Sequence, residues 1–340
     1  MSRKKSITAF ILILFLIATI FSSCQDNGKE VVVYTSVDQV YSEPILRYFE
    51  EQTGINVKAV YDIEATKTVG LVNRLIAEKD YPQADVFWSG EFVQTILLKG
   101  KGMLAPYLSP NASDIPSQYI DPENYWTGFA GRARVLLVNT DLVSPDDYPD
   151  SIYDLVDDTW PADQTGIAYP LFGTTATHAA ALYAAEGTEE ARDYFTQIYE
   201  RGVRVVDGNS VVRDMVVSGQ MKIGMTDTDD SCAALEKGEP VAIIFPDQDS
   251  LGTFVIPNTV AMIQDGPNPD EAKQLIDFLL SVETAKLLIE NGWCQIPLRP
   301  VDARSGCNLD TNIVTMQIDL KSVYDQLETA SNELTEIFIR

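Results

Sequence analysis

The chain is poor in basic side chains, with 25 lysines and arginines against 50 aspartates and glutamates among 340 residues. The net charge of −25 opposes binding to nucleic acid or anionic lipid, because both are themselves negative. The sequence also lacks a G-x-S-x-G elbow, a Walker loop, an H-E-x-x-H pair and a G-x-G-x-x-G turn. No two of its four cysteines have the C-x-x-C spacing of metal sites, which disfavours zinc. These absences leave no signature of the common nucleophilic, nucleotide-binding or zinc enzymes.

Histidine is represented by one residue, His178, within the Ala-rich segment "THAAALYAAEG", and we expect it to have a structural role. Paired carboxylates can hydrolyse glycosides. A sugar site usually carries several exposed aromatic rings, however, and only Trp88 is well placed for that. A secreted hydrolase is therefore a minor alternative, and we assign no catalytic residue and no catalytic cofactor.

Long hydrophobic runs are confined to the N-terminus. The basic residues at positions 3–5 precede an apolar run from Ala9 to Ile20, which is shorter than the roughly 20 residues that a spanning helix needs. This order predicts a secretory signal peptide over residues 1–23 and hence an exported protein.

Cys24 directly follows two serines, in a pattern that resembles the lipobox of bacterial lipoproteins, although Phe21 stands where leucine is usual. The resemblance implies a lipid on Cys24 and a polar tether over residues 24–30. It also implies a location in the periplasm or at the outer face of the cell membrane. An ordinary signal peptide with a nearby cysteine is the alternative.

Strand-like and helix-like segments alternate from Glu30 onward. Runs such as "EVVVYT" and "ADVFWSG" are separated by amphipathic runs such as "TVGLVNRLIAEK", and this β-α-β order implies parallel strands with right-handed crossovers. About 315 residues after the signal exceed one ordinary hydrophobic core, so two lobes are expected. The divisions are lobe 1 over residues 31–135 and 256–310, lobe 2 over 136–255, and a C-terminal helix over 311–340. We predict a monomeric α/β protein whose lobes are mainly parallel sheets flanked by helices, with two crossing strands as hinge.

Polar side chains gather where the predicted strands end, and ligands of open parallel α/β sheets bind just beyond those ends. One group offers hard oxygen ligands to a multivalent cation; it comprises Asp38, Glu64, Glu91, Asp227, Asp229 and Asp230. A second group of hydroxyls and helix-start residues suits an oxyanion; it comprises Ser36, Ser89, Gly173, Thr174, Thr175, Asn209 and Ser210. Taken singly, each residue is equally explained as a helix cap. Their convergence on one crevice predicts either a metal with an accompanying anion, or an organic cation stacked on Trp88.

Three cysteines follow Cys24. Cys294 and Cys307 flank a short loop and are candidates for a disulfide in an oxidising compartment, which would make Cys232 the odd one out; the sequence alone does not show whether the two are joined.

Six segments, in their order and spacing, resemble the iron(III)-binding branch of bacterial periplasmic solute-binding proteins. They are "VVVYTSVDQ", "FEEQTGINVKAVY", "ADVFWSGE", "GFAGRARVLLVNT", "DGNSVVRDMVVSGQMKIGMTD" and "EAKQLIDFLLSVETAKLL", and the resemblance covers nearly all of the mature chain. It implies a type II binding protein whose two lobes close on a ligand and deliver it to an ABC permease and its ATPase.

The residues that bind the anion in this family are matched in this chain better than those that bind the metal. Gly173, Thr174 and Asn209 stand where the family holds phosphate or carbonate, and Arg132 lies in the matching "GRARV". Ferric-binding relatives usually carry adjacent tyrosines, however, where this chain has the aspartates at 229 and 230. They also use a histidine or another ligand at the position of Asp38, and often a glutamate where this chain has Gly90 followed by Glu91.

Loss of both phenolates leaves two interpretations. In the first, carboxylates replace them and the ligand is Fe(III) or another hard cation, with phosphate or carbonate as synergistic anion. In the second, the cleft binds an organic phosphate or phosphonate, or a polyamine-like cation.

Overall fold

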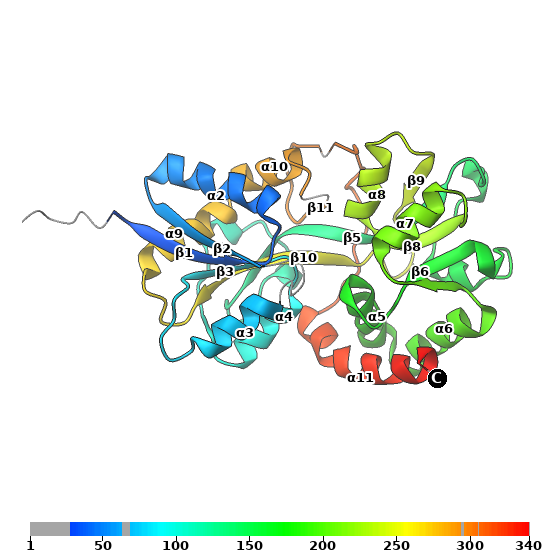
Figure 1. Cartoon of the computed structure of the whole chain (residues 1–340), viewed down its shortest axis with the longest axis horizontal. Coiled ribbons are helices and arrows are strands. Elements are labelled where there is room, and N and C mark those ends of the chain that lie inside the picture. Colours follow the sequence, from blue (N-terminus) through cyan, green and yellow to red (C-terminus); the bar gives the residue numbers. More distant parts are fainter. Residues whose placement is uncertain (1–27, 63–68, 294–295, 305, 340) are drawn as a thin grey trace, which may run out of the picture.

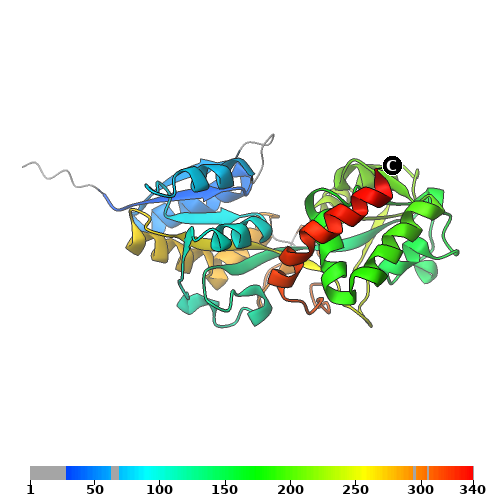
Figure 2. The same ribbon diagram turned by 90° about the horizontal axis from the view of Figure 1, so that it is seen from below.

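The computed structural model describes residues 28–62, 69–293, 296–304 and 306–339, which form two lobes (Figures 1 and 2). The predicted signal peptide, Cys24, Glu64 and Cys294 lie outside these residues. Across the described ranges, none of the helices combines the length and the apolar character that a membrane span requires.

Lobe 1 is built from two parts of the chain: the N-terminal part, and a later part to which the chain returns after lobe 2. Its strands are β1 (Glu30–Thr35), β2 (Asn56–Tyr61), β3 (Val86–Ser89), β4 (Leu104–Ala105) and β11 (Ile296–Pro297). Its helices are α2 (Gln39–Thr53), α3 (Val69–Ala77), α4 (Val93–Gly100), α9 (Pro269–Leu279) and α10 (Val282–Glu290). Strand β1 pairs in parallel with β2 and β3, as the β-α-β order predicts.

Lobe 2 repeats this organisation. Its strands are β6 (Thr165–Ala168), β7 (Arg204–Val206), β8 (Ile223–Asp227) and β9 (Val241–Ile244), and its helices are α5 (Gly173–Glu186), α6 (Thr188–Arg201), α7 (Asn209–Val217) and α8 (Thr228–Leu235). Strand β6 lies between β7 and β8 and pairs in parallel with both. The starts of α5, α7 and α8 therefore meet at one edge of this sheet (Figure 1).

Two long strands, β5 (Thr127–Asn139) and β10 (Val255–Ile263), join the lobes. The first half of β5 pairs with β10 and β11, whereas its second half, from Arg134, pairs with β8 and β9. The sheet order is β2-β1-β3-β10-β5-β8-β6-β7, and the main hydrophobic core is continuous because both long strands are buried along nearly their whole length. The predicted two-lobed α/β fold with two crossing strands is confirmed.

A third connection between the lobes is formed by the C-terminal segment. Helix α11 (Leu320–Phe338) packs against α5 and α6 of lobe 2; it runs along the bottom of that lobe in Figure 1 and across the face turned to the viewer in Figure 2. The helix begins at Leu320 and not at residue 311, where the sequence predicts its start, because the residues before Leu320 run extended beside the hinge. There the amide of Met316 donates to the carbonyl of Thr253 at 2.9 Å.

The disulfide differs from the expected one. Cys232 of α8 is bonded to Cys307, with 5.2 Å between their Cα atoms and a sequence separation of 75. The expected pairing of Cys294 with Cys307 is therefore wrong, because nearness along the chain does not decide which cysteines meet in space. The bond joins the helix of lobe 2 that carries Asp229 and Asp230 to the segment that leads from lobe 1 to α11.

Candidate functional site

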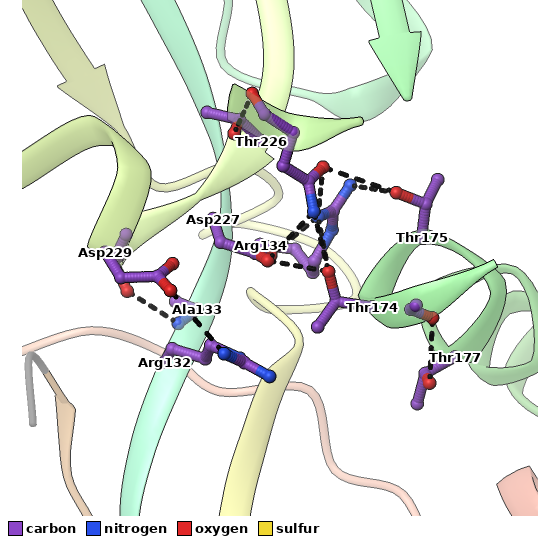
Figure 3. Close-up of polar contacts among 12 residues, drawn as sticks. Arg132, Ala133, Arg134, Thr174, Thr175, Thr177, Thr226, Asp227 and Asp229 are labelled. Carbon is purple, nitrogen blue, oxygen red and sulfur yellow. Dashed lines mark hydrogen bonds and ion pairs between the residues drawn. The ribbon is translucent and has the colours of Figure 1, made fainter. Parts of the chain in front are cut away.

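A buried ion pair between Arg134 and Asp227 organises the lobe 2 side of the site (Figure 3). Nη1 of Arg134 donates to Oδ1 of Asp227 at 2.6 Å. Oδ2 of Asp227 accepts the hydroxyl of Thr174 at 2.6 Å and the amide of Asn209 at 3.0 Å. Nη2 of Arg134 donates to the hydroxyl of Thr175 at 3.3 Å. Thr174 and Asn209, two of the residues predicted to hold an external anion, are thus bonded to a carboxylate of the protein itself.

Strand register and helix starts bring this network together. Arg134 lies directly opposite Asp227 in the antiparallel pairing of β5 with β8. Asp227 ends β8 and precedes α8, Thr174 lies in the first turn of α5, and Asn209 is the first residue of α7. Each of these three polar residues therefore lies at the end of a strand or after it, as the sequence predicts. Arg134 was not predicted, although a basic residue inside an apolar strand signals a buried counter-ion.

A cavity of about 310 Å³ lies between the lobes. Lobe 1 lines it with Asp38 and Tyr41 from the start of α2 and with the residues after α10, and lobe 2 lines it with α8, including Asp229 and Asp230. Carboxylates from both lobes therefore face one space. Glu236 adds a further acidic side chain to its lining.

The two adjacent aspartates each have a guanidinium neighbour. Oδ2 of Asp229 lies 3.5 Å from Nη1 of Arg132, and Oδ1 of Asp230 accepts Nη1 of Arg213 at 2.8 Å. Burial raises the pKa of Asp229, an effect that Arg132 opposes. Burial, together with the charge of Asp229, raises the pKa of Asp230 to about 6.

One carboxylate oxygen of this pair is unsatisfied. Oδ1 of Asp229 is buried and has no hydrogen-bond partner within the described part of the chain. The same holds for Nε of Arg132 beside it. A buried oxygen without a donor is costly, so a bound cation would relieve that cost. Among the residues that the structure describes, however, no preformed group of three or more acidic, histidine or cysteine side chains could hold a metal.

Other predicted residues lie outside the cavity. Burial raises the pKa of Glu91 to about 7, and the positive charge of the nearby Arg132 opposes this rise. The hydroxyl of Ser36 accepts the amide of Gly90 at 3.0 Å, and that of Ser89 accepts the amide of Glu91 at 3.4 Å. These serines therefore shape the loop after β3. Two further predicted residues, Gly173 and Ser210, are exposed at the starts of α5 and α7.

The aromatic contact predicted for an organic cation is wrong. Trp88 is 0% exposed and packs on Phe129, with ring centroids 5.8 Å apart, so no ligand reaches its face. Two rings that the sequence did not single out line the cavity instead: Tyr41 and Trp293, whose centroids lie 4.9 Å apart.

His178 is structural, as expected. It is 4% exposed and stacks on Phe254 with ring centroids 5.6 Å apart. Burial, assisted by the charge of Arg134, lowers its pKa to about 3, so the ring is neutral at physiological pH.

Comparisons with known proteins identify the family and the fold. The profile of the bacterial extracellular solute-binding protein family matches residues 45–305. Iron uptake protein A1 of Synechocystis sp. is 25% identical over 276 residues, covering 78% of this chain and 75% of that protein. A periplasmic protein of Salmonella typhimurium assigned to 2-aminoethylphosphonate binding is 26% identical over 285 residues, covering 80% of each.

A solved structure shares the fold. The Trichodesmium protein in complex with iron and citrate has a TM-score of 0.82 at 20% identity, covering 92% of this chain and 100% of that one. At this identity the likeness establishes the architecture, and the ligand has to be argued from the residues of this chain.

Proposed function

Because the chain belongs to the bacterial extracellular solute-binding proteins, which are not enzymes, we propose that it captures a hard metal cation for an ABC importer, with Fe(III) as first candidate. The observation that carries this proposal is the cavity between the lobes, where Asp38 faces Asp229 and Asp230. Carboxylate oxygens are the ligands that hard cations prefer. Three ionised carboxylates would supply oxygen ligands and negative charge to a trivalent ion.

The proposed mechanism is capture followed by closure. Asp38 moves with lobe 1 and the two aspartates of α8 move with lobe 2, so a cation touched by both favours the closed state through contacts that the open state lacks. Arg132, at the join between the two halves of β5 and 3.5 Å from Asp229, is the contact that we propose for an accompanying anion such as phosphate, carbonate or citrate. Glu64 and Glu91 remain reserve ligands in this proposal.

An organic cation or zwitterion is a second candidate. Tyr41 and Trp293 line the same cavity as the carboxylates, and aromatic faces beside acidic groups suit an alkylammonium ion. An aminophosphonate would place its ammonium among the aspartates and its phosphonate near Arg132.

The N-terminal sequence supports an anchored location. We propose lipidation at Cys24 after removal of residues 1–23, which would hold the protein at the outer face of the membrane beside the permease and ATPase that it serves. Mass spectrometry of the mature N-terminus tests this, since lipidation adds acyl mass to a chain that begins at Cys24.

The cargo is tested on protein purified without chelator. Native mass spectrometry with elemental analysis should find one iron per chain, whereas a bound organic mass would support the second candidate. Asp229→Ala combined with Asp230→Ala should then weaken binding of Fe(III), supplied as its citrate complex, by roughly 100-fold or more. The matched control is Asp146→Ala with Asp147→Ala, an exposed adjacent pair in the same lobe. Undiminished affinity in the first double variant would reject the site.

A further inference from the structure

We propose that the carboxylate of Asp227 is a built-in anion that fills the oxyanion cradle of lobe 2, so that this half of the cleft recruits no anion from solution. The proposal goes beyond the proposed function, because it concerns lobe 2 without any cargo. The proposal also gives Asp227 a different role from Asp229 and Asp230, although all three lie in one short acidic segment.

The donors around Asp227 form the set that an external oxyanion would need. A guanidinium from strand β5, a hydroxyl from the first turn of α5 and an amide from the start of α7 converge at 2.6, 2.6 and 3.0 Å. Helix starts of this kind favour negative charge, and charged donors make the strongest hydrogen bonds to carboxylate or phosphate oxygens. Both oxygens of Asp227 already occupy that place.

Burial and charge balance keep a free anion out. Arg134 is 0% exposed, Asp227 3% and Thr174 8%, so there is little room for another group. One guanidinium faces one carboxylate, and a second anion would bring an unpaired charge into a site from which water is largely excluded. The amide of Asn209 also donates to Thr174 at 2.8 Å, which closes the network further. Arg132 is then left as the contact for an anionic part of the cargo.

Removal of the built-in anion should create a site for a free one. Asp227→Gly deletes the carboxylate and leaves Arg134 with its hydroxyl and amide neighbours, and formate matches the deleted group in charge and size. Thermal unfolding of the cargo-free mature protein is followed while formate replaces chloride at constant ionic strength. At about ten times its dissociation constant, formate should raise the Tm of the variant by roughly 2–4 °C. The wild-type Tm should stay unchanged.

Asp121→Ala provides a matched control. Asp121 is 5% exposed and accepts Nζ of Lys99 at 2.6 Å, so it is a comparably buried acidic partner. In this variant, however, Lys99 still has Glu123 at 2.8 Å, so its ammonium group remains paired with a carboxylate. The Tm of Asp121→Ala should therefore be no higher in formate than in chloride.

Three results would overturn the proposal: an equal response to formate in both variants, no response in Asp227→Gly, or a wild-type Tm that rises in formate as much as that of Asp227→Gly. If Asp227→Gly does not fold in chloride, recovery of its native circular dichroism by refolding in formate supports the proposal, and failure in both salts counts against it. None of these measurements uses the cargo, so the outcome is independent of whether Fe(III) binds.

Discussion

The cavity side chain Asp230 gives the most direct test of what it costs the folded protein to keep two adjacent carboxylates in the cavity. Burial and the charge of Asp229 raise its pKa from 3.8 to about 6, and each pKa unit corresponds to about 1.4 kcal/mol between protonation states. Ionised Asp230 therefore costs the folded protein up to about 3 kcal/mol, which solvent screening at a side chain 20% exposed reduces to about 1–2 kcal/mol. Asp230→Ala should remove this cost, because Arg213 keeps Asp214 as a partner at 2.9 Å.

The sign of the pH dependence follows from the raised pKa. At a pH below the unfolded value of 3.8 the carboxyl is protonated in both states and costs nothing, and as the pH rises through about 6 the penalty appears in full. Relative to wild type, the cargo-free variant should therefore unfold at a temperature higher by roughly 2–6 °C at pH 7.5, and the gain should vanish near pH 4.

Calorimetry of chelator-treated wild type, Asp230→Ala and the exposed control Asp146→Ala measures this difference. A lower Tm for Asp230→Ala at pH 7.5 would refute the reasoning, and so would a difference that does not change with pH. In the same protein, affinity for the cation should fall, so stability and binding should move in opposite directions.

Two further predictions concern residues away from the cavity. Because the pKa of His178 is lowered to about 3, its ring resonances in NMR spectra, the only histidine signals of the chain, should stay constant between pH 8 and 5; an inflection near pH 6.5 would contradict its burial. Cys307→Ser removes the bond to Cys232 and should lower the free energy of unfolding in urea by about 2–5 kcal/mol; if thiol reagents destabilise this variant as much as the wild type, another disulfide is responsible.

Sequence reasoning reached the general position of the site because parallel sheets make it simple. In such sheets polar residues that follow strands collect at one edge, and this rule placed Asp38 and Asp229 at a common gap although they are far apart in the chain. It could not assign roles within "TDTDD", because neighbouring residues of one turn point in different directions. The register of β5 against β8 sets Asp227 opposite Arg134, and only the folded sheet contains that information.

Two other residues show where such reasoning stops. Trp88 lies in a short strand that is buried throughout, so alternation could not reveal which face meets the core. Trp293, which does line the cavity, follows a helix C-terminus with no polar cluster to mark it. In both cases the sequence did not reveal the direction in which the side chain points.

The bond between Cys232 and Cys307 closes the intervening chain into a covalent ring. That ring contains β9 of lobe 2, the crossing strand β10, and helices α9 and α10 of lobe 1, so it passes through both halves of the molecule. A single backbone cut in the turn between β10 and α9 would therefore leave one connected molecule until a thiol opened the ring. Because synthesis runs from the N-terminus, moreover, the helix that presents the acidic pair can be covalently tied to this segment only after β9, β10, α9 and α10 have all been made.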